Sequence, residues 1–505
     1  MLRALRLLRL DLLSGRSGWV VPVLALLPAM WLLWREEFSP LSAVLAATPL
    51  LVFAFTDTRF AIYATFLFLF LLGDIRRIVG LYIGFPTQDP LLLVGPAVTL
   101  LLSLPILYRL RLTDPISKAV FAVTVLMTLE IFNPRQGSLT VGLTGAFFQL
   151  IPLLWFWIGR RYGTDQVIFT LLFRLVLPLA VLATALGFWQ IYIGFLPWQA
   201  EWVKMASAHY HSLSIAGFTR AFGFSVNGIE YVNLLLIGST SVLGAFFAGR
   251  RVYVLLFPFL GAGLFLASSR QPILKLLIAV ALAWSLRGKS RTWAARLPIA
   301  IGIGVGLLAL VLTRAGGGSE DSGQPKATSA AQASTQHQVQ GLAHPLGKGS
   351  TAQGHIHYFL GGIRQGFVYP IGSGLGVVRG GVADKEDTGA AELNTTEYDI
   401  SDSFITMGAV GGLLYVAIVF LVIRKAISFN RSAPAYVALP VVGIVVAMIG
   451  SWTALGQYGV APFMWFIIGS MTRPRTQSVQ VRAFRPAPSV RQMPPYFHDA
   501  QPKEA

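Results

Sequence analysis

Cysteine is absent from this sequence, and charged residues occupy only 12% of its 505 positions. The lack of cysteine excludes disulfide bonds, thiolate metal sites and cysteine nucleophiles. The shortage of charge excludes a soluble globular protein, because hydrophobic residues make up 54% of the chain and a core of ordinary size could not enclose them. Together with a mean hydropathy of +0.64, the composition predicts a polytopic membrane protein.

Apolar segments separated by polar connections fill most of the sequence. Crossing the hydrocarbon layer takes roughly 17 to 25 residues, and by that measure we count about fourteen candidate spans. They predict an all-α fold, a polytopic bundle of membrane helices in two blocks, 18–313 and 401–472. A polar stretch at 314–400 predicts one large external loop, and the region near 197–230 predicts a smaller external segment.

The two ends of the chain and part of the loop have other compositions. Arginine recurs at every third position in the leucine-rich start, with no cleavage site after an apolar core, which predicts an interfacial helix over 1–17 on the inner leaflet. The proline-containing stretch 473–505 predicts a disordered cytoplasmic tail. Within the large loop, 315–348 is poor in apolar residues and is expected to be mobile, whereas 355–376 contains aromatic residues that are expected to pack against the bundle.

Basic pairs fall in alternate connections of the predicted bundle. These pairs are Arg109 and Arg111, Arg160 and Arg161, Arg250 and Arg251, Arg287 and Lys289, Arg424 and Lys425, and Arg473 and Arg475. By the positive-inside rule, both termini then lie in the cytoplasm, and the large loop lies on the periplasmic or extracellular side of the inner (plasma) membrane. Topology and the anionic lipid of the bilayer thus account for the net charge of +18, and nucleic acid is not an expected partner.

Arginine also occurs in the outward connections, where topology gives no reason for it. The residues concerned are Arg76, Arg77, Arg220, Arg270 and, in the large loop, Arg364. A planar guanidinium binds two phosphate oxygens at once and keeps its charge, so these side chains predict binding of a lipid-linked diphosphate. The alternative for each of them is contact with lipid headgroups or pairing with a neighbouring acid.

Histidine and aspartate supply candidates for a base that would accept the proton of a hydroxyl group. His355 and His357 lie in the large loop, where catalysis, a solvated or structural role and metal binding are all open. Two histidines without a third ligand at a recognisable spacing are a poor metal signature, so no metal site is predicted. Asp399 and Asp402 precede the next apolar segment, where a carboxylate is either a base or an ordinary helix cap.

Several local motifs follow one another in a set order. Arg220-Ala-Phe-Gly-Phe-Ser-Val-Asn227 leads into an apolar segment, and Ser268-Ser-Arg270-Gln-Pro joins two others. Pro370-Ile-Gly-Ser-Gly-Leu-Gly376 precedes Asp399-Ile-Ser-Asp402 and a helix that carries Gly408, Gly411 and Gly412. In this order, over about 220–415, the motifs resemble those of the O-antigen polymerase and ligase superfamily. Glu130-Ile-Phe-Asn-Pro134 and Asp74-Ile-Arg-Arg77 also look like elements of bacterial exopolysaccharide relatives.

The resemblance implies a GT-C-like glycosyltransferase without a cofactor or a metal. The donor would be a polyprenyl-diphosphate-linked glycan, the acceptor a hydroxyl group of another glycan or lipid, and other polysaccharide assembly proteins would be partners. Transfer would invert the anomeric centre on the outer face of the membrane and release the lipid diphosphate. The motifs carry over Arg220 and Arg270 as diphosphate ligands, while Arg364 is chosen for its position in the loop.

One departure from the family leaves the base open. Many members carry a His-Asn pair at the end of the large loop, and here the stretch from Glu397 to Asp402 contains no histidine. At this position a carboxylate, Asp399 or Asp402, is the candidate replacement, and His355 and His357 stay open as bases. The competing functional class is a flippase or polysaccharide transporter, for which charged residues along a central path and short external loops are expected.

Overall fold

A computed structural model describes residues 28–85, 89–207, 214–215, 217–287, 296–299, 302, 327–343, 352–378, 398–453 and 456–474. The helix predicted over 1–17 and nearly all of the predicted tail therefore lie outside the described residues. The chain divides into two units, Met1–Thr472 and Arg473–Ala505, and the features described below belong to the first.

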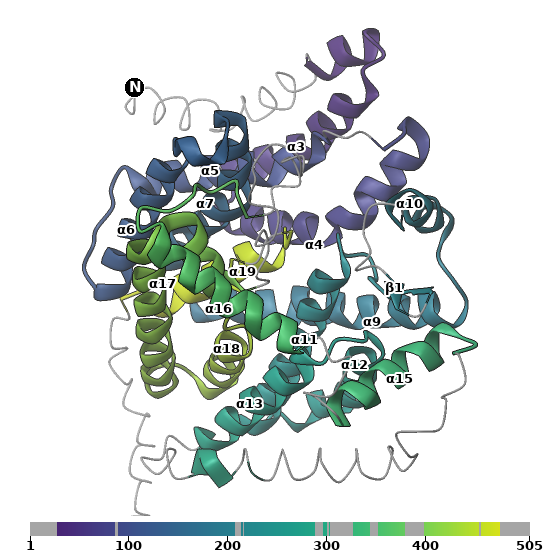
Figure 1. The fold of residues 1–505 in the computed structure, drawn as a ribbon, viewed down its shortest axis with the longest axis vertical. Coiled ribbons are helices and arrows are strands. Elements are labelled where there is room, and N and C mark those ends of the chain that lie inside the picture. Colours follow the sequence, from purple (N-terminus) through teal and green to yellow (C-terminus); the bar gives the residue numbers. More distant parts are fainter. Residues whose placement is uncertain are drawn as a thin grey trace, which may run out of the picture. The chain divides into compact units, whose positions relative to one another are not determined.

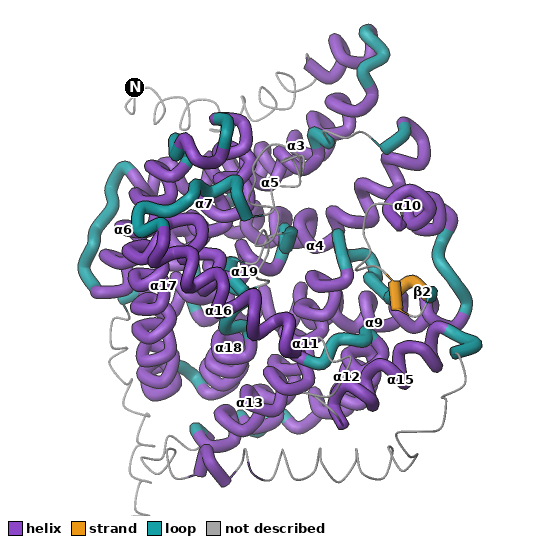
Figure 2. Tube along the Cα trace, in the orientation of Figure 1, coloured by secondary structure: helices purple, strands orange, loops and turns teal. Residues whose placement is uncertain are grey.

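The described chain is helical almost throughout, which confirms the predicted all-α class (Figures 1 and 2). The first helices are α3 (Phe38–Thr56), α4 (Thr58–Ile83), α5 (Leu91–Leu107), α6 (Pro115–Glu130) and α7 (Leu139–Tyr162). Next come α8 (Asp165–Phe169), a π-helical segment (Thr170–Val176), α9 (Leu177–Tyr192), α10 (Pro197–Ser207) and α11 (Gly228–Phe247). A 3-10 helix (Arg251–Leu256) leads to α12 (Phe257–Leu266), α13 (Gln271–Ser285), α15 (Ala330–Ala343) and α16 (Ala352–Val368). The chain ends with α17 (Asp399–Ser432), α18 (Ala435–Ala447) and α19 (Val460–Thr472).

Several of these helices are long and apolar enough to cross a membrane, in agreement with the predicted membrane protein. By length and composition the five candidates are Phe38–Thr56, Leu139–Tyr162, Asp165–Tyr192, Gly228–Phe247 and Asp399–Ser432. Shorter apolar helices add Leu91–Leu107, Arg251–Leu266, Gln271–Ser285, Ala435–Ala447 and Val460–Thr472. The total of about fourteen spans stays a prediction.

Helices α7 and α19 form the centre of the packing. Gly159 of α7 faces the Phe466 carbonyl and Gly469 of α19 faces the Phe156 carbonyl, so closely that a Cβ atom at either position would collide with the opposite backbone. Such small residues let two apolar helices approach backbone to backbone. Beside them, the Trp155 indole donates a hydrogen bond to Thr99 Oγ1 at 2.8 Å, which satisfies its one polar atom inside the bundle.

Helix α17 is broken near its beginning by the glycine-rich segment 370–376. Gly408 has φ 67° and ψ −169°, a backbone conformation open mainly to glycine. At the break, the carbonyls of Ile405 and Thr406 accept hydrogen bonds from the N–H groups of Ser373 (3.0 Å) and Gly374 (3.1 Å). A Cβ atom at Gly408 would overlap the Pro370 carbonyl, so this glycine is what allows the segment to enter the break.

Helix α15 forms inside 315–348, which the sequence predicted to be mobile. Its sequence begins with two alanines, the strongest helix formers. Its start is capped, because Ser329 Oγ accepts from the Gln332 N–H at 3.3 Å and Gln332 Oε1 accepts from the Thr328 N–H at 3.0 Å. Over Ala330–Ala343, local capping and tertiary contact outweigh the low apolar content and form a helix, while the mobility of the stretch stays a prediction.

Candidate functional site

Arg220 lies between a short hairpin and the segment 221–227. Arg77 contacts this segment and holds its backbone. Strands β1 (Ser214–Ile215) and β2 (Phe218–Thr219) pair antiparallel just before it (Figure 2). Arg77, only 2% exposed, donates from Nη2 to the Val226 carbonyl at 2.9 Å. Its guanidinium also lies 4.2 Å from the centroid of the Phe222 ring. The backbone that follows Arg220 is thus held at both Phe222 and Val226.

A partly buried carboxylate and two buried amide groups complete this support. Asp74 pairs with Arg77 at 3.0 Å and accepts from Gln199 Nε2 at 3.1 and 3.0 Å. Gln190 Oε1 accepts from the N–H groups of Phe222 (3.0 Å) and Gly223 (2.9 Å). Every one of these polar contacts is charge-assisted or made to the backbone, so together they hold the segment in the conformation described.

The far end of the segment is fixed by Glu230, at the start of α11. Its Oε2 accepts from the Val226 N–H at 3.3 Å, and its Oε1 accepts from the N–H groups of Gly459 (2.5 Å) and Val460 (3.4 Å). Asn227 adds a hydrogen bond from Nδ2 to the Gly456 carbonyl at 2.9 Å. The Arg220 segment and the first residues of α19 are therefore joined through one carboxylate.

The two arginines predicted near residue 76 are both paired with acids. Arg76 donates from Nε to Asp89 Oδ2 at 2.5 Å, and Arg77 is bound to Asp74 as described above. These contacts match the alternative that the sequence left open for them, pairing with a neighbouring acid. The role of Arg76 and Arg77 as diphosphate ligands stays a prediction, and both are omitted from the site proposed below.

Arg270 occupies a tight turn between α12 and α13. Ser268, with φ 58°, reverses the chain, and Arg270 follows directly before the first turn of α13. Partial burial lowers the pKa of Arg270 below its ordinary value, although a guanidinium stays charged at neutral pH. Among the described residues, no acidic side chain forms a salt bridge with it. A partly desolvated cation without a carboxylate partner is a suitable ligand for an anion.

Helix α15 is docked on this turn and brings a third group to it. The fully buried Gln338 donates from Nε2 to the carbonyls of Phe265 and Ser269, both at 3.0 Å. Next to it, half-buried His337 has its pKa lowered by burial and then by the positive charges of Arg270 and Arg220. Arg220 and Arg270, taken from separate motifs, therefore lie near one imidazole.

His337 was not predicted from the sequence. It lies in the stretch expected to be mobile, and nothing in its neighbours indicates that Arg220 and Arg270 would approach it. The local signals that were present, two alanines and the cap at Ser329, predict a helix but not its docking site.

The other predicted residues of the large loop lie on α16, which packs along α17 (Figure 1). His357 and Arg364 are exposed and His355 is half-buried. The two histidines lie on different sides of the helix because they are two residues apart. Among the contacts of the described residues, none joins Arg364 to Arg220 or Arg270, and its role stays a prediction.

Asp399 is buried and bound at the beginning of α17. Its Oδ2 accepts from the Tyr415 hydroxyl at 2.8 Å and from the N–H groups of Trp452 (2.6 Å) and Thr453 (3.2 Å). The residue before it, Tyr398, is the N-cap of the helix and makes no side-chain cap hydrogen bond. Asp399 therefore fixes the loop before α19 and does not cap its own helix. Asp402 is buried one turn later, and whether either carboxylate is a base stays a prediction.

A hydrogen bond connects Tyr398, at the beginning of α17, to the Arg270 turn, and a ring contact connects Tyr398 to α16. Gln271 Nε2 donates to the Tyr398 hydroxyl at 2.6 Å, and Phe359 of α16 meets the Tyr398 ring edge-on with centroids 5.6 Å apart. Lys275, one turn into α13, donates to Ser451 Oγ at 2.9 Å beside the loop that Asp399 binds. The turn is thus bordered by α15 on one side and by the beginning of α17 on another.

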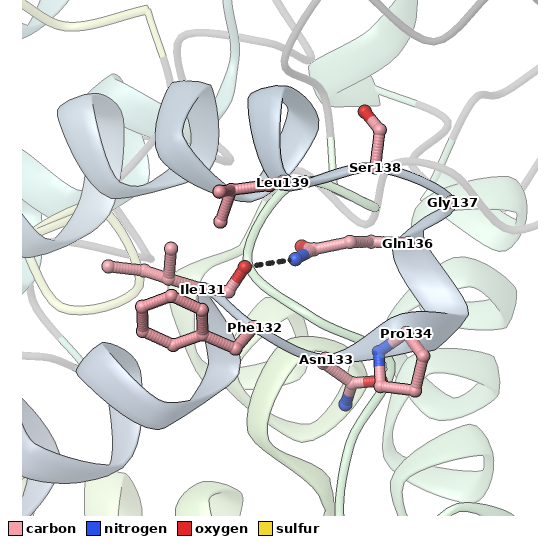
Figure 3. A pocket seen from close by; sticks show the side chains of 8 residues that line it. All are labelled: Ile131, Phe132, Asn133, Pro134, Gln136, Gly137, Ser138 and Leu139. Atoms are coloured by element: carbon pink, nitrogen blue, oxygen red, sulfur yellow. Dashed lines mark hydrogen bonds between the residues drawn. The ribbon is translucent and has the colours of Figure 1, made fainter.

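A separate small pocket lies where the Glu130-Ile-Phe-Asn-Pro134 motif meets the glycine-rich segment. It has a volume of about 180 Å³ and is bordered by the turn from Ile131 to Leu139, where Gln136 donates to the Ile131 carbonyl at 2.5 Å (Figure 3). Asn133 donates to the Gly372 carbonyl at 3.2 Å, and Gln136 Oε1 accepts from the Gly376 N–H at 3.2 Å. This motif positions the glycine-rich segment, and none of the predicted arginines or histidines lines the pocket.

Comparisons of the chain with protein-family models, with curated proteins and with solved structures found no match. The resemblance to the O-antigen polymerase and ligase superfamily accordingly rests on the order of the motifs, and the candidate site rests on the geometry around Arg220 and Arg270.

Proposed function

We propose that the chain is a membrane glycosyltransferase of the polysaccharide polymerase or ligase type, and that Arg220 and Arg270 bind the diphosphate of a polyprenyl-linked glycan donor. The observation that carries this proposal is the docking of α15 on the Arg270 turn, where Gln338 donates to the Ser269 carbonyl at 3.0 Å and the positive charges of Arg270 and Arg220 both act on the neighbouring His337. Additional support comes from the partial burial of Arg270 without an acidic partner among the described residues. An anion would neutralise charges that the fold brings together.

The chemistry of such a transfer is a single displacement at the anomeric carbon. A hydroxyl oxygen of the acceptor attacks that carbon opposite the leaving group and forms the new glycosidic bond. The bond to the diphosphate oxygen breaks, its electron pair stays with the diphosphate, and the configuration inverts. Fixed guanidinium groups stabilise the negative charge that develops there. The hydroxyl proton passes to a base, for which Asp399, Asp402, His355 and His357 remain the candidates.

The proposed setting is the outer face of the inner (plasma) membrane. Both termini would lie in the cytoplasm and the loop 314–400 outside, in a GT-C-like bundle of about fourteen spans. The acceptor would be a glycan or a lipid, and no metal or cofactor is part of the proposal. The alternative function is a flippase or transporter of the same lipid-linked glycan, which would use the arginines to bind but not to transfer.

Reconstitution into liposomes with a lipid-linked repeat unit tests the proposal. Longer glycan and free lipid diphosphate should accumulate with the wild-type protein, and Arg220→Ala or Arg270→Ala should reduce the rate at least 100-fold, because about 2.7 kcal/mol is a typical loss for one group that stabilises developing negative charge. Arg424→Ala, at an exposed position of α17, is the matched control and should retain the rate. Movement of the donor across the bilayer without bond formation would favour the transporter and contradict the proposed enzyme.

A further inference from the structure

Helix α15 presents one continuous face to the Arg270 turn. Ala333, Ser334 and Gln338 are buried, and His337 lies one turn after Ala333 and next to Gln338. Residues three and four apart share a face of a helix, so these four side chains form a single stripe. The two hydrogen bonds from Gln338 to the carbonyls of Phe265 and Ser269 fix that stripe against the end of α12 and the residue before Arg270.

The surroundings of His337 contain positive charge from two directions and no negative charge among the described residues. Helix α15 packs mainly against α9, α12, β1 and β2, and none of these elements has an acidic or basic side chain in its described residues. The charged groups that act on the imidazole are Arg270, from the turn, and Arg220, from the segment after β2. In this setting the imidazole is uncharged at neutral pH.

An anion bound between the two guanidinium groups would favour the protonated form of the His337 imidazole. Its negative charge would offset the two positive charges that disfavour protonation of the imidazole. A protonated imidazole has N–H donors at both ring nitrogens and can donate to a phosphate oxygen. The proton would come from solvent, and no covalent bond would form or break.

We propose that His337 is a third member of the Arg220 and Arg270 anion site, which takes up a proton when a diphosphate binds and then donates a hydrogen bond to it. This inference rests on the proposed diphosphate site and adds proton-coupled binding to it. Helix α15 is then part of the binding site, and Gln338 is the residue that positions it.

Calorimetric titration of the purified full chain with inorganic diphosphate tests this inference. Binding measured between pH 6 and pH 8, in buffers of different ionisation enthalpy, gives the number of protons taken up. The wild-type protein should bind more tightly as the pH falls, by up to about tenfold per pH unit for one linked proton. His337→Gln keeps a hydrogen-bonding side chain without a titratable group, and should lose this proton uptake and flatten the pH dependence.

The controls separate this inference from the proposed function. Diphosphate itself also takes up protons in this pH range, and it does so equally with the wild-type protein and with His337→Gln. The proton uptake of His337 is therefore the difference between the two titrations. Thr335→Ala, on the exposed side of α15, should behave like the wild-type protein. Equal proton uptake by the wild-type protein and His337→Gln overturns the role of His337 and leaves the proposed site intact. Diphosphate binding that is unchanged in both Arg220→Ala and Arg270→Ala, or absent from the wild-type protein, overturns the proposed site together with this inference.

Discussion

The guanidinium of Arg77 lies 4.2 Å from the centroid of the Phe222 ring, on the segment that follows Arg220. It also pairs with Asp74 and lies 4.3 Å from the centroid of the Trp202 ring. An arginine in α4 therefore acts on the candidate site through the backbone that it supports. Contact of Arg77 with substrate is not needed to explain its burial.

Arg77→Ala should destabilise the protein strongly. The substitution leaves the Asp74 carboxylate without its buried cation, and breaking a buried ion pair in this way costs about 3–5 kcal/mol. Thermal unfolding in detergent, followed by tryptophan fluorescence, should show a much lower midpoint than the wild-type protein. Arg35→Ala is the control, because the side chains of Arg35 and its partner Glu37 are 51% and 47% exposed and an exposed pair contributes about 0–1 kcal/mol. Equal losses for the two variants would contradict the supporting role of Arg77.

Gly408→Ala should disturb the break in α17. The added Cβ atom would meet the Pro370 carbonyl, and the backbone conformation of Gly408 is strained for any other residue, at about 1–3 kcal/mol. A lower unfolding midpoint is the expected result. Gly261→Ala in α12 serves as the control, since nothing lies within 4 Å of the new Cβ atom, and a helical glycine replaced by alanine gains up to about 1 kcal/mol. An unchanged midpoint for Gly408→Ala would contradict the tight fit of the glycine-rich segment.

Acid should loosen α15 through His337. Docking lowers the pKa of His337 below its ordinary 6.5, so the undocked helix binds the proton more tightly than the docked one. The stability of docking is therefore complete above pH 6.5 and falls as the pH drops from 6.5 toward the pKa of the docked state. Hydrogen exchange, expressed as protection factors for Ala330–Ala343, should show lower protection at pH 5 than at pH 7. His337→Gln should remove the difference, and an equal loss of protection in that variant would assign the effect to another group.

Gln338→Leu should release the same helix at every pH. The substitution removes both hydrogen bonds from Nε2. The Phe265 carbonyl keeps the Ser268 N–H at 3.4 Å, whereas the Ser269 carbonyl loses its donor, at about 1–3 kcal/mol. Limited proteolysis should cut α15 faster than in the wild-type protein. Diphosphate should bind more weakly because His337 is no longer held near Arg270. Unchanged cleavage would show that other contacts dock the helix.

The helical class could be predicted from the sequence, and Arg220 and Arg270 could be singled out as candidates, each for a local reason. Hydropathy is a property of each segment, so apolar helices could be recognised without knowledge of their neighbours. Arg220 and Arg270 stood out because short motifs surround them. The glycines of 370–376 indicated a close backbone approach, although the broken helix that receives them could not be inferred.

What could not be predicted depends on contacts between distant parts of the chain. Whether Arg77 binds a ligand or an acid depends in part on Gln199, which lies 125 positions from Asp74 and binds the same carboxylate. Helix α15 could not be predicted from the polar composition of 315–348. The apolar face of that helix is short, and its docking uses the buried Gln338. Asp399 had the spacing of a helix cap, yet its donors Trp452 and Thr453 belong to a loop that no local pattern could identify.

The carboxylate of Glu230 has a consequence for biosynthesis. It accepts hydrogen bonds from the Val226 N–H and from the N–H groups of Gly459 and Val460. Val460 lies 230 positions after Glu230 in the sequence. A ribosome must therefore translate almost the whole bundle before the Arg220 segment acquires its last support. If Arg220 and Arg270 bind a lipid-linked diphosphate as proposed, nascent chains that end before Gly459 lack the last support of the Arg220 segment, so the proposed activity is expected to begin only after α19 has been made.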